Sequence, residues 1–238
     1  MLVEIVSHCW NYTRLLVYQL SSLALYKPDT PTMLTVFAAE SDEDTVMAVK
    51  TFKAAGVNAR LWLLPMEMVK NRSIGRNMAA KETKADVVWF SDCDLVFGDG
   101  AIDSLYIDEQ WSSGEEKLFR PHHVLNHNSL WMGDEYIDRV ESLCSYDVQA
   151  EDFTKSRIRR PSGAYQIVSG DVARKHGYVP DIESHQEPYR QPEFRRNYSD
   201  VGYRKQLARA GVFKGVLEIP NVYRIRHTIS GTVSEVRL

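Results

Sequence analysis

Apolar and polar positions alternate between two patterns along the first hundred residues of the chain. Runs rich in apolar residues have five to eight positions, which is the length of a buried strand. These runs cover residues 2–7, 33–39, 57–64 and 87–91. Between them, longer stretches repeat apolar residues at helical spacing, and they cover residues 12–26, 44–55 and 73–84. The first part of the chain is therefore predicted to consist of repeated strand-helix-strand units.

Local signals support several of these boundaries. Asn11 or Thr13 is expected to cap the first helix, because short polar side chains accept hydrogen bonds from exposed backbone amides there. Gly56 directly follows the second helical stretch and is typical of a helix end. Repeated units with buried strands predict an α/β fold, in which helices flank both faces of a mostly parallel sheet. Without a convincing linker, residues 1–238 are expected to form a single domain.

The second part of the chain is less regular. Short strands are expected at residues 118–120, 165–169, 216–219 and 222–225. Helices are expected at residues 134–144, 170–176 and 199–210. Residues 183–199 show no periodicity and predict a loop that can close over a site. His122, His123 and His127 fit no structural zinc spacing, and we interpret this segment as a polar loop beside the acceptor.

The run at residues 87–91 ends in two carboxylates, Asp92 and Asp94. On an extended strand, residues i and i+2 lie on the same face. Two acidic groups at the end of a buried strand are unfavourable unless they are paired or bind a cation. A divalent cation with oxygen ligands satisfies both, so this pair predicts a metal site.

Two other strand ends are polar as well. Ser7 closes the first run, and Glu40 and Asp42 follow the second. Ligands of open α/β sheets bind outside the carboxyl ends of the strands, so these side chains are expected to contact a bound nucleotide. For Asp42, capping of the helix that follows is an equally good interpretation.

The order of these segments resembles a known family. Gly75-Arg76-Asn77 opens a helix, and Asp86-Val87-Val88-Trp89-Phe90-Ser91-Asp92-Cys93-Asp94 follows it. This block is similar to the signature of the family 2 glycosyltransferases and their GT-A-fold relatives, although Ala79 stands where the family often has glycine. The resemblance implies a GT-A, Rossmann-like fold, with residues 1–100 binding the nucleotide sugar and residues 101–238 binding the acceptor.

The resemblance also implies roles for individual residues. Asp92 and Asp94 would hold Mn²⁺ or Mg²⁺ on the diphosphate of a nucleotide-diphosphate sugar, with His227 as a further metal ligand. Arg76 would lie near the diphosphate or pair with an aspartate of the site. Asp200 would act as the general base that takes the proton from an acceptor hydroxyl in an inverting transfer.

Charge is distributed unevenly and bears on the acceptor. Residues 1–153 carry 13 basic and 24 acidic residues, whereas residues 154–238 carry 16 basic and 8 acidic residues. A basic second part suits an anionic partner, so the acceptor is expected to be a saccharide or another hydroxyl compound, with a nucleic-acid acceptor as a further candidate. A nucleotidyltransferase using Mg²⁺ and a non-catalytic nucleotide-sugar-binding protein are the alternative functions.

Two features of composition concern the cellular setting. The longest apolar runs fall short of the roughly 18 to 20 residues of a membrane-spanning helix, so no membrane span is expected. The three cysteines are odd in number and irregularly spaced, which favours reduced thiols and a cytoplasmic location.

Overall fold

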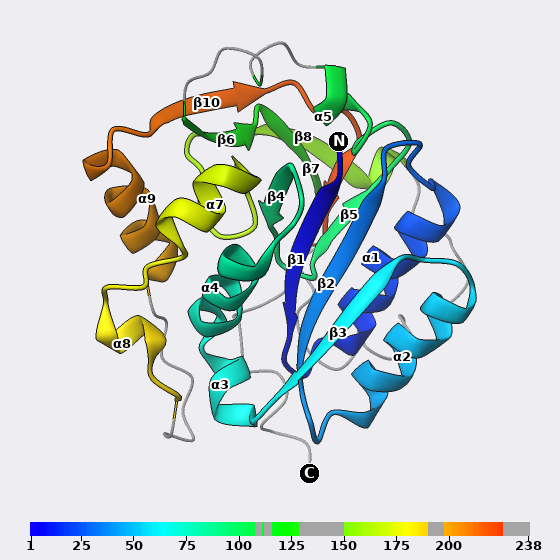
Figure 1. The fold of residues 1–238 in the computed structure, drawn as a ribbon. Coiled ribbons are helices and arrows are strands. Elements are labelled where there is room, and N and C mark those ends of the chain that lie inside the picture. Colours follow the sequence, from blue (N-terminus) through cyan, green and yellow to red (C-terminus); the bar gives the residue numbers. More distant parts are fainter. Residues whose placement is uncertain (108–110, 112–115, 129–149, 190–197, 226–238) are drawn as a thin grey trace.

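Seven strands form the main sheet, in the order β10-β6-β9-β4-β1-β2-β3. The computed structural model describes residues 1–107, 111, 116–128, 150–189 and 198–225. The strands of this sheet are β1 (Val3–Cys9), β2 (Thr32–Ala39), β3 (Ala59–Leu64), β4 (Val87–Phe90), β6 (Lys117–Pro121), β9 (Gln166–Ser169) and β10 (Phe213–Leu217). Figure 1 shows the carboxyl ends of β1, β2 and β3 pointing to the same edge of the molecule.

The sheet is mostly parallel, as the alternation of strands and helices predicts. β3, β2, β1 and β4 pair in parallel, and so do β6 and β10. β9 is antiparallel to both of its neighbours, β4 and β6. Since β9 separates them, β4 and β6 run in the same direction, and both end at the same edge as β1.

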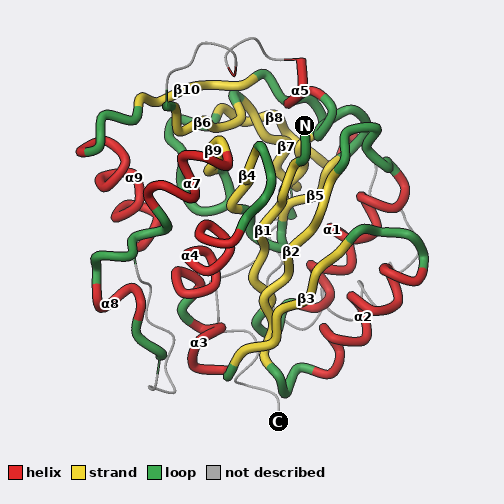
Figure 2. The backbone as a smooth tube through the Cα atoms, in the orientation of Figure 1, coloured by secondary structure: helices red, strands yellow, loops and turns green. Residues whose placement is uncertain are grey.

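Helices cover both faces of this sheet (Figure 2). Core contacts place α1 (Thr13–Leu25) and α2 (Glu43–Ala54) on one face. They place α4 (Arg72–Glu82), α7 (Gly170–His176) and α9 (Ser199–Arg209) on the other. Shorter helical segments are α3 (Met66–Lys70), α5 (Ser104–Ile107), η2 (Ala150–Asp152) and α8 (Glu183–Gln186).

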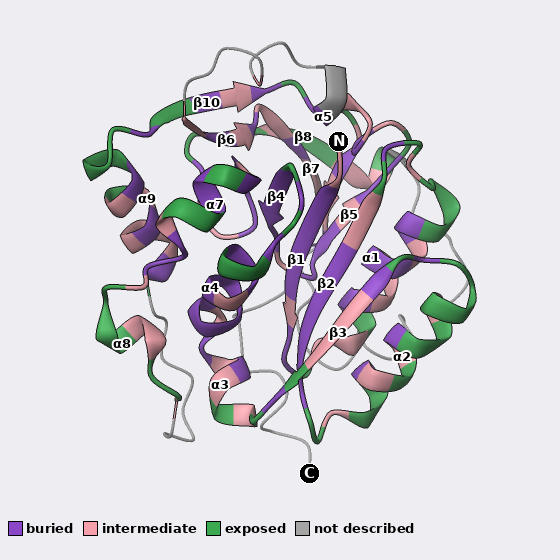
Figure 3. Cartoon of the chain, in the orientation of Figure 1, coloured by how far each residue is buried: buried purple, intermediate pink, exposed green. Residues whose placement is uncertain are grey.

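Alternation along the strands supplies both hydrophobic cores. Ile5 of β1 packs with the α1 and α2 side, whereas its neighbour Val6 packs with the α4 side. Successive strand side chains point to opposite faces, so a strand covered by helices on both faces is apolar at every position. Figure 3 shows β4 buried along its whole length and β1 buried along most of its length.

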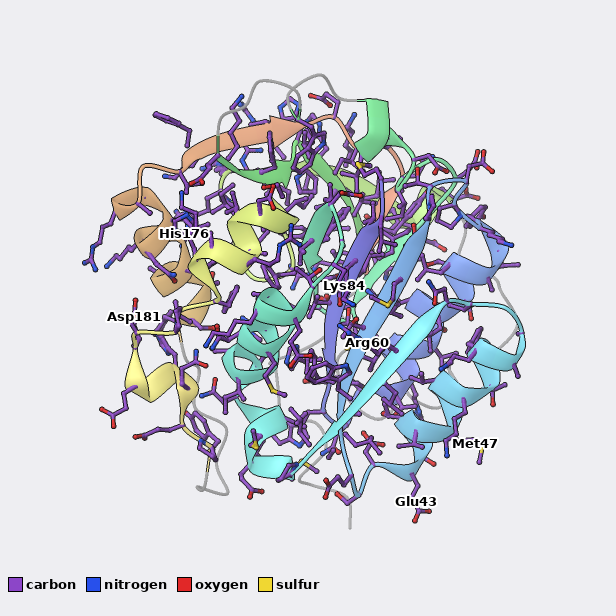
Figure 4. The ribbon with its side chains drawn as sticks, in the orientation of Figure 1. Glu43, Met47, Arg60, Lys84, His176 and Asp181 are labelled. Carbon is purple, nitrogen blue, oxygen red and sulfur yellow. The ribbon has the colours of Figure 1, made fainter. Side chains whose placement is uncertain are left out.

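One acidic side chain lies inside the sheet. Glu4 of β1 is fully buried and accepts hydrogen bonds from Thr35 at 2.5 Å and from Thr83 at 2.6 Å. Arg60, labelled in Figure 4, reaches across from β3 and forms an ion pair with it at 2.7 Å. The buried charge is therefore compensated by a cation and two hydroxyl groups.

A second sheet lies beside the first and corrects one expectation. It consists of β5 (Leu95–Phe97), β11 (Val222–Arg224), β7 (His123–His127) and β8 (Phe153–Arg157), in that order. The interpretation of residues 122–127 as a polar loop is therefore wrong, because β7 pairs with both β11 and β8. Val124 is buried against the core while the flanking His123 and Leu125 are half-buried, and this alternation fits a strand.

The helix boundaries differ from expectation at two places. Neither Asn11 nor Thr13 caps α1, because Asn11 lies in the left-handed region at φ 56° and Tyr12 takes the cap position without a side-chain hydrogen bond. The loop expected at 183–199 is wrong for residues 183–186, which form α8. The expected helix at 134–144 and residues 190–197 of the expected loop lie outside the described residues.

Two further expectations concern cysteines and membranes. Cys9 and Cys93 are buried and neither forms a disulfide, and the Cys9 thiol is hydrogen-bonded to the Thr45 hydroxyl at 3.2 Å. Within the described part of the chain, no helix has the length and apolar character needed to cross a membrane. The cytoplasmic location stays a prediction.

Candidate active site

The aspartate pair lies in a turn at the carboxyl edge of the main sheet. β4 ends at Phe90, and β5 begins at Leu95. The backbone amide of Leu95 donates to the carbonyl of Asp92 at 3.2 Å, which closes the turn. The expectation that Asp92 and Asp94 share one face of a strand is therefore wrong, because the chain leaves the extended conformation before it reaches them.

Asp92 accepts hydrogen bonds from two arginines of α4. Arg72 Nη1 lies 2.9 Å from Asp92 Oδ1 and 3.2 Å from Oδ2, and Arg76 Nη2 lies 2.9 Å from Oδ1. Burial alone raises the pKa of Asp92, but the charges of Arg72, Arg76 and Arg224 outweigh it and lower the pKa to about 2. Asp92 is therefore ionised at neutral pH.

Arg76 connects the aspartate turn to α9. Its buried guanidinium also donates to the Ser91 carbonyl at 2.8 Å and to the Tyr178 hydroxyl at 2.9 Å. That hydroxyl donates to Gln166 Oε1 at 2.7 Å, and Gln166 Nε2 donates to the Asp200 carbonyl at 3.2 Å. Of the two expectations for Arg76, pairing with an aspartate of the site is confirmed.

Asp200 occupies the first turn of α9. The negative charge of Asp200 contributes to the raised pKa of Arg72, after the larger contribution of Asp92. Arg72 therefore lies within electrostatic range of both aspartates. The backbone of Asp200, 108 positions beyond Asp92 in the chain, is linked to the aspartate turn through Gln166, Tyr178 and Arg76, and its role as general base stays a prediction.

Asp94 is held by the second sheet. Arg224 of β11 donates from Nε to Asp94 Oδ2 at 2.8 Å, and the Asp94 side chain is only 3% exposed. The Ile225 amide donates to the Asp94 carbonyl at 2.9 Å, which adds a backbone contact. The adjacent Asp94 carboxylate raises the pKa of Arg224 further above its usual range. Asp94 thus joins the main sheet to β11.

Ser7 is linked to the aspartate turn through Gln19. Its hydroxyl is fully buried and donates to Gln19 Oε1 of α1 at 2.8 Å. Gln19 Nε2 in turn donates to the Asp92 carbonyl at 3.2 Å. The structure gives Ser7 a positioning contact, and direct contact of Ser7 with a nucleotide stays a prediction.

His8 lies at the end of β1 next to the start of α4. Its ring stacks on Phe37 with centroids 4.8 Å apart. Within the described residues, neither ring nitrogen has a hydrogen-bond partner. Burial, followed by the charges of Arg76 and Arg72, lowers the pKa of His8 well below its usual value, so the imidazole is neutral. A Cβ added at Gly75 would lie 2.3 Å from His8 Nε2, so only glycine allows this approach.

The two acidic residues after β2 differ in their contacts. Asp42 caps α2, accepting from the Thr45 amide at 3.0 Å and from its hydroxyl at 2.8 Å. The capping interpretation of Asp42 is therefore confirmed. Glu40 is exposed, and its backbone amide donates to the Leu64 carbonyl at 3.1 Å. Contact of either side chain with a nucleotide stays a prediction.

The aspartate turn fits a divalent cation in the type of ligand it offers. Mg²⁺ and Mn²⁺ prefer oxygen ligands, and Asp92 and Asp94 each supply a carboxylate. A cation at Asp94 would replace the contact with Arg224, which is 40% exposed and has room to move. His227, the expected further ligand, lies outside the described residues.

A different set of possible ligands comes together at the second sheet. Among the described residues, only His122, His123 and Glu218 bring three histidine, cysteine or acidic groups together, with ligand atoms within 4.8 Å of one another. His122 Nδ1 is hydrogen-bonded to the Glu218 carboxylate. The lowered pKa of His123 comes from burial first and then from the nearby charges of His122 and Lys155.

Several residues of the site were not identified from the sequence. Arg72 precedes Arg76 by one helical turn, and this i, i+4 spacing is a signal that could have found it. Tyr178, Gln166 and Gln19 gave no comparable signal. Their roles depend on contacts between segments that lie 12 to 102 positions apart, which only the fold brings together.

The sequence matches no protein-family model and no curated protein sequence. Solved structures nevertheless match. TarS residues 1–349 from S. aureus, in complex with UDP-GlcNAc, is similar with a TM-score of 0.65 and 13% identity, over 100% of this chain and 62% of that one. The mannosyltransferase PcManGT from Pyrobaculum calidifontis, in complex with GDP-Man and Mn²⁺, has a TM-score of 0.53 and 15% identity, over 97% of this chain and 58% of that one.

A third structure is the galactosyltransferase LgtC with donor and acceptor sugar analogues. Its TM-score is 0.52 at 15% identity, over 90% of this chain and 73% of LgtC. The chain thus spans 58% to 62% of the compared TarS 1–349 chains. At such identities the likeness is one of fold. The chain has the GT-A-like fold of nucleotide-sugar transferases, as its resemblance to that family implied.

Proposed function

We propose that this chain is a metal-dependent glycosyltransferase that moves a sugar from a nucleotide-diphosphate sugar to an acceptor hydroxyl with inversion. The observation that carries the proposal is the aspartate turn at the carboxyl edge of the sheet. Arg72, Arg76 and Arg224 contact its two carboxylates, which leaves one excess positive charge. A site with this balance attracts a diphosphate and also offers oxygen ligands to a cation.

Arg72 and Arg224 are the residues best placed to bind the donor. Their side chains are 33% and 40% exposed, whereas Arg76 is fully buried and is fixed by its partners. A guanidinium presents a planar set of N–H groups that matches phosphate oxygens. Arg76 therefore positions Asp92, and the two exposed arginines orient the diphosphate.

Asp94, with Asp92 beside it and His227 as a further candidate, would hold Mn²⁺ or Mg²⁺. When bound, such a cation stabilises the negative charge that develops on the departing nucleoside diphosphate. The carboxylate of Asp94 is nearly fully buried and therefore has a fixed position. A fixed ligand favours one geometry for the diphosphate beside it.

Asp200 is the proposed general base. It would take the proton of the acceptor hydroxyl while that oxygen attacks the anomeric carbon and the bond to the diphosphate breaks. The contact from Gln166 to the Asp200 carbonyl ties the start of α9 to Tyr178 and Arg76. This network supports the proposal, because it sets the base at a constant position relative to the donor aspartates.

The proposal is tested with Asp94→Asn and Asp200→Asn in the full chain. Nucleotide sugars are screened with Mn²⁺, and release of nucleoside diphosphate is measured with and without EDTA. Asp94→Asn should lose the metal-dependent release. Asp200→Asn should retain donor binding but lose transfer, with a decrease of about 100-fold or more. The matched control is Asp171→Asn, because the Asp171 side chain is 93% exposed and away from the site.

Three outcomes contradict the proposal. Full activity of Asp94→Asn in the presence of Mn²⁺ excludes the metal assignment. Release of pyrophosphate instead of nucleoside diphosphate indicates a nucleotidyltransferase. Binding of nucleotide sugars without turnover of any of them indicates a binding protein that has retained the fold.

A further inference from the structure

A cavity of about 490 Å³ lies beside the junction of the two sheets, and none of its lining residues belongs to the aspartate turn. Its lining residues are Arg120, Ser156, Arg157 and Arg159. This volume falls in the usual range for small-molecule sites, but such sites are mostly apolar. Three guanidinium groups around one cavity point instead to an anionic ligand.

The charges of this arginine pocket are not compensated by acidic groups. Within the described residues, none of its three arginines forms an ion pair, and Arg120 donates only to the Pro121 carbonyl at 3.2 Å. Burial, and next the charge of Arg157, lowers the pKa of Arg120. The acidic Glu218 lies nearby, but it is hydrogen-bonded to His122. The like charges repel one another, and a bound anion would relieve this repulsion.

The strand register places the pocket relative to the aspartates. Phe119 of β6 pairs with Ile167 of β9, which pairs with Trp89 of β4. Arg120 follows Phe119, so it lies level with Phe90 at the carboxyl edge of the sheet. Two strand spacings separate β6 from β4, or roughly 10 Å. The pocket is therefore beside the aspartate turn, on the side of β9 away from β1.

We propose that this arginine pocket binds a phosphate group carried by the acceptor. This inference rests on the proposed function, since it names the class of its acceptor. A phosphate group offers three strong acceptor oxygens, which three guanidinium groups and the Ser156 hydroxyl can share. A carboxylate has only two oxygens and leaves more of these donors without a partner. The acceptor is thus a phosphate-bearing saccharide or polyol, with its hydroxyl toward Asp200.

The test uses glucose 6-phosphate as the probe, glucose as its neutral counterpart, and calorimetric titration of the full chain. Glucose 6-phosphate should bind, and glucose should not. Arg157→Ala and Arg159→Ala should each weaken the binding of glucose 6-phosphate about tenfold, and the double variant about 100-fold. Arg157 and Arg159 are exposed, so these changes leave the core intact. The matched control is Arg160→Ala, an exposed neighbour that does not line the pocket.

Two further measurements separate this inference from the proposed function. Arg72→Ala should leave binding of glucose 6-phosphate unchanged, because Arg72 belongs to the aspartate turn. Binding of UDP and GDP with Mn²⁺, followed by thermal shift, should be the same in the double variant as in the original chain. If neither nucleotide raises the Tm of the original chain, the proposed function fails. The calorimetric titration still shows in that case whether the pocket binds glucose 6-phosphate.

Several results would overturn the inference. Equal binding of glucose 6-phosphate by the double variant and the original chain removes the pocket as the site. Loss of binding in Arg72→Ala instead shows that the probe occupies the donor site. Binding of duplex DNA that the double variant loses, without binding of glucose 6-phosphate by the original chain, assigns the arginines to nucleic acid.

Discussion

Arg76→Ala should destabilise the protein far more than Arg72→Ala, although both arginines contact Asp92. Arg76 is fully buried and donates to four groups: Asp92, the Ser91 and Gly163 carbonyls and the Tyr178 hydroxyl. Arg72 is 33% exposed, and among the described residues it donates to Asp92 alone. Removing Arg76 weakens the Asp92 pair and also leaves the Ser91 and Gly163 carbonyls and the Tyr178 hydroxyl without their donor, so the cost should be near that of a broken buried ion pair, about 3–5 kcal/mol.

Arg72→Ala should have only a small effect on stability. A partly exposed ion pair contributes about 0–1 kcal/mol, since water and salt screen it. For a chain of 238 residues, 1 kcal/mol corresponds to a change of about 2–4 °C in Tm. Arg76→Ala should therefore lower Tm by about 6–20 °C, and Arg72→Ala by at most about 4 °C.

Thermal unfolding at pH 7 gives Tm, and urea unfolding gives the free energy; both are followed by far-UV circular dichroism for the two variants and the original chain. Equal m-values confirm that the same surface is exposed on unfolding, so midpoints can be compared. Arg76→Lys keeps the charge but loses the planar set of donors, and it should recover part of the stability. Equal losses for Arg76→Ala and Arg72→Ala would refute the reasoning, because burial and partners would then not decide the effect.

Three further predictions concern stability. The folded-state pKa of Asp92, about 2, lies below its ordinary value of 3.8. Asp92 therefore contributes stability above pH 4 that is lost as the pH falls through 2. The free energies of unfolding of the original chain and of Asp92→Asn, measured between pH 1 and 7, should differ by about 2 kcal/mol above pH 4, and this difference should disappear below pH 2. Gly75→Ala should lower stability by about 1–3 kcal/mol in urea, because the new Cβ would meet His8 Nε2 at 2.3 Å, and a neutral effect would refute this contact. Arg60→Ala should lower stability by at least about 1 kcal/mol in the same assay, because it leaves the Glu4 carboxylate buried without its cation. The 32% exposure of Arg60 reduces this effect. Unchanged stability would show that the Thr35 and Thr83 hydroxyls satisfy Glu4 by themselves.

The spacing of apolar residues along the chain predicted most of the helices and strands, because that spacing depends directly on whether one or both faces of an element are buried. The stretch from β1 to β4 follows the predicted runs closely. The second sheet was harder to predict, since β7 and β8 are short and most of their residues are polar. Their strand conformation depends on pairing with β11 and with each other, and no local signal encodes such pairing.

For the aspartate pair as well, the sequence predicted one part and the tertiary structure decided the other. The sequence by itself determined that Asp92 and Asp94 follow a buried strand and that Arg76 belongs to the helix before it, and its resemblance to a known family implied the GT-A type of fold; the expected opening of that helix at Gly75 is wrong, because α4 begins at Arg72. Only the tertiary structure decided which charges they meet. Asp92 faces two arginines of α4, whereas Asp94 faces Arg224, which lies 130 positions away in the chain. Electrostatic contacts depend on distance in space, and spacing along the chain predicts that distance only within one helix or strand.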